Sequence, residues 1–375
     1  MTVLVIYLFS IFVFGILADW SKDKRIKNIY LVAVFLFAFL YSAFRASSVG
    51  IDTESYRTIF NNINMNGLSE LPRNTEMEKG FMLLCYLLGR IISNPQIIII
   101  VMSAVTSYAF YFIIKKYSKS YMISSLIFAS MIFMATMNIS RQFFALSFVL
   151  FAISFALDKK PIKTILMIII GASMHNSALI FLPLILLSFP RINLKSKSTI
   201  IICTMSALAI PAYVALISFV TSVFPQYARF LSSARYSSRT EISIMFVLFL
   251  IFILILNVWS NKKKSKEVGE VDDTKKILAG KNLYYLFTIL LVNYIVIYVI
   301  STKMLIVNRL ICYFQVSLLI VVPGIINNLM QERNKDLLSI IVAILCCGYF
   351  LKYGYNYYIS DPHGILPYSL ILDED

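Results

Sequence analysis

Arg141, His175 and Asp52 are the side chains in this sequence whose types suit catalysis; the first two lie at the ends of apolar runs, and Asp52 lies in the polar segment after another. A guanidinium offers several planar N–H donors and binds phosphate well. An imidazole exchanges protons near neutral pH, so His175 could accept a proton from an attacking hydroxyl. Asp52 is the alternative base, although an aspartate before a helix is more often its N-cap. From residue type alone, the arginine points to recognition of a phosphate or a carboxylated sugar.

The segment Ser140–Pro183 determines how two of these side chains are placed. It contains an apolar run that begins near Arg141, a basic turn at 158–161, a second apolar run, and then His175. As helices, the first run spans about 27 Å and the second about 20 Å. Arg141 and His175 are therefore expected on the same side of a bilayer. The alternative for His175 is a structural role, in which it caps the break between two half-helices.

Composition identifies the class of protein. The chain has 375 residues, of which 59% are apolar and 14% charged, and its mean hydropathy is +0.80. This is too much apolar surface for a soluble fold, so we predict an all-α polytopic membrane protein. The five cysteines and two histidines have no metal-ligand spacing. We therefore expect no metal and no other cofactor.

Apolar runs of bilayer length predict about 11 to 12 transmembrane helices. They lie near 2–18, 29–44, 97–114, 121–138, 141–157, 162–174 with 176–189, 199–222, 241–260, 283–300, 305–326 and 337–352. Residues 80–93 are apolar but too short for a regular span, and a crossing there would put basic loops on the wrong side. They are predicted to form a re-entrant or interfacial helix at the outer face, beside an outer cavity.

Lysine and arginine are distributed differently between the two predicted sides of the membrane. Of the 34 lysines and arginines, 22 lie in six loops, and 19 of those 22 are lysine. These loops are expected to be cytoplasmic: 19–29, 115–120, 158–163, 191–197, 261–281 and 327–337. Nine of the remaining 12 are arginine. Arginine on the outer side points to recognition of phosphate or carboxylated sugar, since compositional drift would not sort by side.

The predicted organisation is a single integral membrane domain over 1–375. Its parts are an outer loop with interfacial helices at 45–96, an outer basic-aromatic loop at 223–240, a cytoplasmic charged loop at 261–281 and an outer C-terminal tail at 353–375. In the basic-aromatic loop, Arg229, Arg235 and Arg239 alternate with aromatic residues such as Tyr236. This mixture suits sugars and phosphates, or alternatively an interfacial belt at the headgroup level.

An ordered set of short motifs carries a family resemblance. The set comprises Arg45 with Gly50-Ile-Asp52-Thr53 and Tyr56, Glu78-Lys-Gly80-Phe81, Ser140-Arg141-Gln142, His175-Asn-Ser177 with Pro183, Asn308-Arg309, and Pro367-Tyr368. It resembles the EpsG family of bacterial membrane proteins, which is grouped with Wzy-type polymerases of O-antigen, capsule and exopolysaccharide. The sequence departs from the family in having no long acidic outer loop.

The resemblance implies a glycosyltransferase that polymerises lipid-linked oligosaccharide repeat units at the outer face of the bacterial cytoplasmic (inner) membrane. The substrate would be an undecaprenyl-diphosphate-linked oligosaccharide, with a chain-length regulator and a flippase as candidate partners and no nucleic acid. His175, Arg141 and Asp52 would be catalytic, and Ser140 would cap the helix that points at the diphosphate. The expected substrate- and diphosphate-binding residues are Arg45, Tyr56, Arg141, Arg229, Arg235, Tyr236, Arg239 and Arg309.

Three other activities compete with this prediction. An O-antigen-ligase-like enzyme would use nearly the same chemistry. A glycosyltransferase that uses a polyprenyl-phosphate sugar would need an acidic pair in the first outer loop, which Asp52 and Glu54 could supply. A flippase or transporter of lipid-linked oligosaccharide would carry arginine along an internal cavity across the membrane depth. The arginines here gather at span ends and no inverted repeat is evident, which counts against transport.

Overall fold

The structure is a computed structural model that describes residues 1–67, 77–206, 243–267, 274–301, 305–330 and 337–373. Across these ranges the chain is helical with no β-strand, and Arg45 and Leu370 form an isolated antiparallel bridge. Eight helices in the described part are long and apolar enough to cross a membrane. They are Thr2–Trp20, Lys24–Ala43, Gln96–Tyr117, Tyr121–Asn138, Ser140–Leu157, Ile244–Lys262, Gly280–Ser301 and Ile311–Leu329. The prediction of an all-α polytopic membrane protein is confirmed.

The chain forms two compact units. Unit 1 comprises Met1–Ile192 and Ile340–Asp375, and unit 2 comprises Asn193–Ser339. The elements of unit 1 are α1 (Thr2–Trp20), α2 (Lys24–Ala43), α3 (Thr53–Asn66), α5 (Lys79–Gly89), α6 (Gln96–Tyr117), α7 (Tyr121–Ile127), the π-helical turn η2 (Phe128–Ile132), α8 (Phe133–Asn138), α9 (Ser140–Leu157), α10 (Pro161–Met174), η3 (Asn176–Phe181), α11 (Leu184–Ser188), α19 (Leu337–Ser360, which begins in unit 2) and η4 (Ile371–Asp373). Unit 2 contains helical residues 196–206, α14 (Ile244–Glu267), α15 (Thr274–Ser301), α16 (Leu305–Asn308), α17 (Ile311–Gln315) and α18 (Leu318–Met330).

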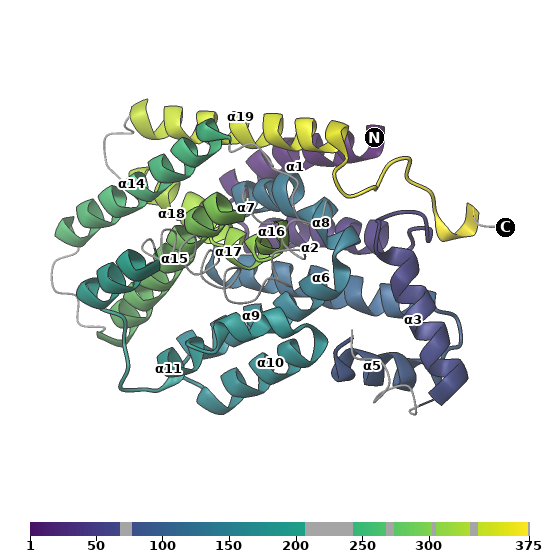
Figure 1. The fold of residues 1–375 in the computed structure, drawn as a ribbon. Coiled ribbons are helices and arrows are strands. Elements are labelled where there is room, and N and C mark those ends of the chain that lie inside the picture. The colour runs from purple at the N-terminus through teal and green to yellow at the C-terminus, as the bar shows by residue number, and fades with distance from the viewer. Residues whose placement is uncertain (68–76, 207–242, 268–273, 302–304, 331–336, 374–375) are drawn as a thin grey trace, which may run out of the picture. The chain divides into compact units, whose positions relative to one another are not determined.

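Helix α9 is the centre of unit 1. It packs against α10 and α6, and Figure 1 shows α9 and α10 side by side. Of its span, 78% is buried inside the protein, against 33% for α1. The close approach of α10 depends on Gly171, where a Cβ atom would lie 3.1 Å from the Ala145 carbonyl oxygen. Small residues of this kind are what let helix backbones approach within a membrane.

Loops that were predicted to be cytoplasmic meet at one end of unit 1. Lys116 Nζ lies 2.7 Å from Asp158 Oδ2. The Tyr121 backbone N–H donates to Asp19 Oδ1 at 3.1 Å. The start of α9 and the candidate active site lie at the opposite end of the helices. The loops at 19–29, 115–120 and 158–163 therefore lie at the end of unit 1 opposite to the start of α9.

Some element boundaries differ from the predictions. Helix α5 has 11 residues and is shorter than a span, as expected for 80–93. The predicted charged loop at 261–281 is largely helical, because α14 continues to Glu267 and α15 begins at Thr274. Lysine is a good helix former, which favours helix in this segment. The predicted tail at 353–375 is also shorter, since α19 continues to Ser360.

The remaining predicted spans do not correspond to any of the eight helices that are long and apolar enough to cross a membrane. They fall on α10, which has 14 residues, on 176–189, on 199–222 and on α19. The second of these is broken into η3 and α11, with Pro183 at the N-cap of α11. The third lies mostly outside the described residues.

Candidate active site

A cluster of three ionisable side chains lies where α5, α9 and α10 meet in unit 1. Arg141 Nη1 donates to Glu78 Oε2 at 2.7 Å. The other carboxylate oxygen, Oε1, lies 3.7 Å from His175 Nδ1 and accepts the Asn176 backbone N–H at 2.9 Å. The side chains of Glu78, Arg141 and His175 are 11%, 13% and 21% exposed, so the cluster is partly open to its surroundings. The structure thus brings Arg141 and His175 together through Glu78.

Backbone features hold this cluster in place. Glu78 is the N-cap residue of α5, and the next residue but one is Gly80. A Cβ atom at Gly80 would lie 2.5 Å from Ser173 Cβ and 2.7 Å from the Ser173 carbonyl oxygen, so only glycine allows α5 to approach α10 this closely. His175 ends α10 in an extended conformation (φ −157°, ψ 121°). The start of α5, which carries Glu78, and the end of α10, which carries His175, are therefore in contact and position the two side chains.

His175 also has the capping role that was considered as an alternative. Its Nδ1 accepts the Ser177 backbone N–H at 3.3 Å, which satisfies a donor at the start of η3. Ser177 Oγ lies 2.8 Å from the same ring nitrogen. A hydroxyl can donate or accept, so Nδ1 retains a partner in either neutral tautomer of His175. Capping through Nδ1 places the ring proton on Nε2, whereas proton acceptance at Nε2 requires the other tautomer, in which Nδ1 donates to Ser177 Oγ and no longer accepts the Ser177 backbone N–H.

The guanidinium of Arg141 is supported on its apolar side. Its central carbon lies 5.6 Å from the centre of the Phe81 ring, which is a cation–π contact. Phe81 belongs to a buried hydrophobic cluster from α3, α5, α6 and α9 that includes Phe60, Ile98 and Phe144. The Nε atom of Arg141 is buried and has no hydrogen-bond partner in the part of the chain that the structure describes. Arg141 is thus held rigidly while not all of its donors are used.

Arg45 requires a correction. It was predicted to bind diphosphate, but its side chain is completely buried. Its Nε donates to Thr53 Oγ1 at 3.2 Å, its Nη2 donates to Ser140 Oγ at 2.9 Å, and its Nη1 donates to the Ser42 carbonyl oxygen at the end of α2. Burial lowers the pKa of Arg45 to about 10, so it remains charged at neutral pH. In this conformation Arg45 joins α2, α3 and α9, and its side chain is enclosed by protein.

Ser140 also differs from its predicted role. The N-cap of α9 is Ile139, and Ser140 is the first helical residue. The Ser140 hydroxyl donates to the Thr136 carbonyl oxygen at 2.8 Å while it accepts from Arg45. Its oxygen is therefore used to hold the buried guanidinium and not to cap the helix.

Asp52 and Tyr56 lie at the start of α3, where Tyr56 contacts Arg141 of α9. Asp52 is in the N-cap position of α3, but its side chain forms no capping hydrogen bond. The Tyr56 hydroxyl lies 3.5 Å from Asp52 Oδ2 and interacts with the Arg141 backbone. Burial and the nearby Asp52 carboxylate raise the pKa of Tyr56 above its ordinary value. Tyr56 is buried, so it links Asp52 to Arg141 and has little surface for a substrate.

Five predicted binding residues remain, of which one lies in unit 2 and four lie outside the described residues. Arg309 is exposed in unit 2, in the turn between α16 and α17. The basic-aromatic loop residues Arg229, Arg235, Tyr236 and Arg239 lie outside the described residues.

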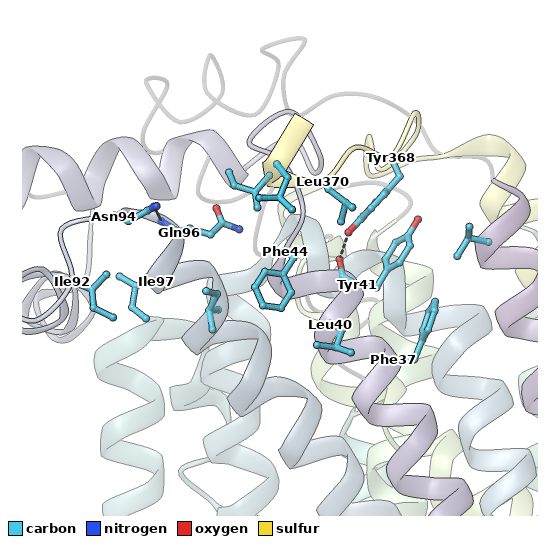
Figure 2. A pocket seen from close by; sticks show the side chains of 14 residues that line it. Phe37, Leu40, Tyr41, Phe44, Ile92, Asn94, Gln96, Ile97, Tyr368 and Leu370 are labelled. Atoms are coloured by element: carbon cyan, nitrogen blue, oxygen red, sulfur yellow. Dashed lines mark hydrogen bonds between the residues drawn. The ribbon is translucent and has the colours of Figure 1, made fainter. Parts of the chain in front are cut away.

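A large apolar cavity of about 1110 Å³ lies between the ends of α1, α2 and α6 and the C-terminal tail (Figure 2). The Tyr368 ring is stacked on Tyr41 with 3.9 Å between the ring centres, and its hydroxyl donates to the Tyr41 carbonyl oxygen at 2.7 Å. Gln96 lines the cavity and donates from Nε2 to the carbonyl oxygens of Ala43 and Arg45, at 2.8 and 3.1 Å. The cavity is therefore on the same end of unit 1 as the Arg45 loop.

A family model for the EpsG family matches residues 28–370 of this sequence. The chain belongs to the EpsG family. Its matched region contains the whole Glu78–Arg141–His175 cluster and every residue of the Arg45 contacts. A search of the curated proteins and a search of the solved structures find no match.

Sequence reasoning overlooked three residues of this EpsG family member. Glu78 belonged to the set of family motifs but was not predicted as a site residue, yet it lies between Arg141 and His175. The sequence signal that could have found Glu78 is Gly80, two positions later, because this glycine allows close contact between two helices. Asn138 and His363 lie beside Asp52. They were not predicted as site residues, because Asn138 and His363 are 225 residues apart in the sequence. Within the described ranges, no three His, Cys, Asp or Glu side chains are grouped so as to hold a metal ion.

Proposed function

We propose that this EpsG family member is a polysaccharide polymerase, that is, a glycosyltransferase that joins lipid-linked oligosaccharide repeat units. Family membership supports the general activity. The cluster of Arg141, Glu78 and His175 at one end of the helices is the single observation that supports a group-transfer site. It combines an anion-binding cation, a proton acceptor and a carboxylate within direct contact distance.

In the proposed reaction, a sugar hydroxyl of the acceptor unit attacks the anomeric carbon of the glycan on the donor lipid. The new C–O bond forms as the bond between that carbon and the diphosphate oxygen breaks, and undecaprenyl diphosphate leaves with the electron pair. The hydroxyl proton passes to His175 Nε2. For this step Nδ1 carries the other proton and donates it to Ser177 Oγ, 2.8 Å away. The resulting imidazolium is stabilised by Glu78, whose carboxylate oxygen is 3.7 Å away.

Arg141 would stabilise the negative charge that develops on the leaving diphosphate. Its ion pair with Glu78 occupies Nη1, while the guanidinium has further N–H groups in a fixed planar arrangement. Glu78 thereby has two roles, since it orients Arg141 and faces His175. Asp52 is the alternative proton acceptor, because its carboxylate is uncommitted to helix capping and lies near Arg141 through Tyr56.

We assign the apolar cavity to the isoprenoid chain of the lipid carrier. Its lining is mostly aliphatic and aromatic, with Phe37, Leu40 and Phe44 along α2 (Figure 2). A second apolar cavity of about 720 Å³ shares Val3 and Phe37 with it and continues along α1 and α2. Together the two cavities follow α2 from residue 26 to residue 44, which is about 27 Å of helix and close to the thickness of the hydrocarbon core. A long chain could therefore lie along α2 with its head at the end that holds the site.

The site is proposed to face the outside of the bacterial cytoplasmic membrane. This orientation rests on the charge pattern, in which the lysine-rich loops mark the cytoplasmic end. A flippase and a chain-length regulator remain candidate partners.

The proposal is tested by the length of surface polysaccharide in cells. Cells that depend on the His175→Ala variant should keep the protein in the membrane but display glycan of single-repeat length. Normal long-chain ladders in such cells would contradict the catalytic assignment. Accumulation of lipid-linked repeats on the cytoplasmic face would instead favour a transporter.

A further inference from the structure

The C-terminal tail, residues 361–371, is bound along the loop that precedes α3. The Gly50 N–H donates to the Gly364 carbonyl oxygen at 2.8 Å, and the Ala46 N–H donates to the Ser369 carbonyl oxygen at 3.0 Å. Gly50 has a positive φ of 87°, and a Cβ atom there would lie 2.5 Å from the Met137 carbonyl oxygen. Glycine at this position therefore allows the loop to lie between the tail and the end of α8.

A chain of hydrogen bonds connects the tail to Asp52. The Asp52 backbone N–H donates to Asn138 Oδ1 at 3.1 Å. Asn138 Nδ2 lies 3.1 Å from His363 Nδ1, and His363 Nε2 lies 2.6 Å from the Tyr357 hydroxyl. An amide nitrogen can only donate, so His363 Nδ1 must accept and the ring proton must be on Nε2. The contacts are thus consistent with one neutral tautomer of His363.

We propose that His363 and Asn138 are positioning residues that hold the start of α3, and with it Asp52 and Tyr56, against Arg141. The only side-chain contact described for the Asp52 backbone N–H is the one with Asn138. Asn138 is buried at the end of α8, two residues before α9 begins, so it relates the position of α3 directly to that of Arg141. His363 fixes the orientation of the Asn138 amide, since Nδ1 accepts only from the nitrogen side. The functional part of this inference rests on the proposed function.

The ionisable groups around His363 favour its neutral form. Burial lowers the pKa of His363 to about 4, against an opposing effect of the Asp361 carboxylate. That carboxylate accepts the backbone N–H groups of Ile365 and Leu366, both at 2.8 Å. Tyr357 from α19 and Asp52 from α3 are the other ionisable residues linked to this network. If Nδ1 of His363 were protonated, two N–H donors, one from each residue, would face each other, and the hydrogen bond with Asn138 would be lost.

Hydrogen exchange at the Asp52 amide tests the positioning role without any assay of activity. Purified full-length protein is compared with His363→Gln and His363→Asn. The Asn variant places an oxygen near the position of Nδ1 and can still accept from Asn138, whereas the Gln variant places its polar group near Nε2. We expect exchange in a peptide covering residues 50–54 to be at least tenfold faster in His363→Gln and close to wild type in His363→Asn. Equal exchange in both variants, whether fast or slow, would overturn the proposal.

A pH series separates this role from a merely structural one. Between pH 7 and pH 4, after correction for intrinsic exchange rates, wild-type protection at residues 50–54 should decrease while that of His363→Asn stays constant. Parallel behaviour of the two proteins would also overturn the proposal. Glycan length is measured on the same variants. If exchange responds as expected but glycan length does not change in His363→Gln, the positioning of α3 stands and its contribution to glycan extension is overturned, whereas the proposed function itself is tested by His175→Ala.

Discussion

Glu78 and Arg141 form a 2.7 Å ion pair whose side chains are only 11% and 13% exposed. Removal of one partner from a pair this buried leaves a charge with little solvent around it. Glu78→Gln should therefore lower the free energy of unfolding by about 3 kcal/mol. The double variant Glu78→Gln/Arg141→Gln should be destabilised by less than the sum of the two single variants, because it leaves no charge unpaired. Thermal unfolding of the four proteins in one detergent measures this coupling, and strict additivity would argue against the ion pair.

Replacement of Arg141 by lysine tests the need for a guanidinium. Lysine keeps the charge but loses the planar set of donors and the contact over Phe81. We expect the rate of glycan extension to fall by about 100-fold, as is typical when a donor to developing negative charge is lost. Arg90→Lys is the matched control, because Arg90 is exposed at the other end of α5 and packs over Tyr86. Similar rates for both variants would remove Arg141 from the reaction.

The Gly80 contact can be tested by adding one methyl group. In Gly80→Ala the new Cβ atom would lie 2.5 Å from Ser173 Cβ, so α5 must move away from α10 and carry Glu78 away from His175. We expect a loss of stability of about 1–3 kcal/mol and a marked loss of glycan extension. Gly348→Ala in α19 is the control, since a Cβ atom there meets nothing within 4 Å. It should be neutral or slightly stabilising. Equal stability of the two variants would show that the helices do not meet as described.

Acid should destabilise the contact of the tail with its loop. The pKa of His363 is lowered by burial from 6.5 to about 4, so between these values the unfolded chain binds a proton that the folded chain does not. Unfolding is therefore favoured as pH falls from 6.5 towards 4, by up to about 3 kcal/mol from this group. The difference in melting temperature between wild type and His363→Asn should change across this range and be constant above pH 7. A difference that does not vary with pH would contradict the buried, neutral histidine.

Much of unit 1 could be predicted because the signals are local. Hydropathy identifies the spans, and the break at His175 follows from two short apolar runs joined at a polar residue. That Arg141 and His175 lie at the same end of the helices could also be predicted, since both positions follow from helix length. The role of Glu78 could not, because its contact with His175 spans nearly one hundred residues and depends on the packing of α5 on α10.

The burial of Arg45 was also beyond prediction. An arginine at the end of a span normally reaches water or a headgroup. Here Ser42 and Thr53, which are near Arg45 in the sequence, and Ser140, which is 95 residues away, accept hydrogen bonds from its guanidinium inside the protein. The tail could be described from sequence as aromatic and rich in turns, but its pairing with the loop at 44–51 involves residues more than 300 positions apart.

The most direct test of the account is extension of defined lipid-linked repeat units by purified protein, with the products sized on a gel. Wild-type protein should convert single repeats into a ladder of longer chains, and His175→Ala should leave them as single repeats while still folding with a normal melting temperature. A ladder from His175→Ala formed at the wild-type rate would contradict the central claim that the Glu78–Arg141–His175 cluster carries out glycan transfer.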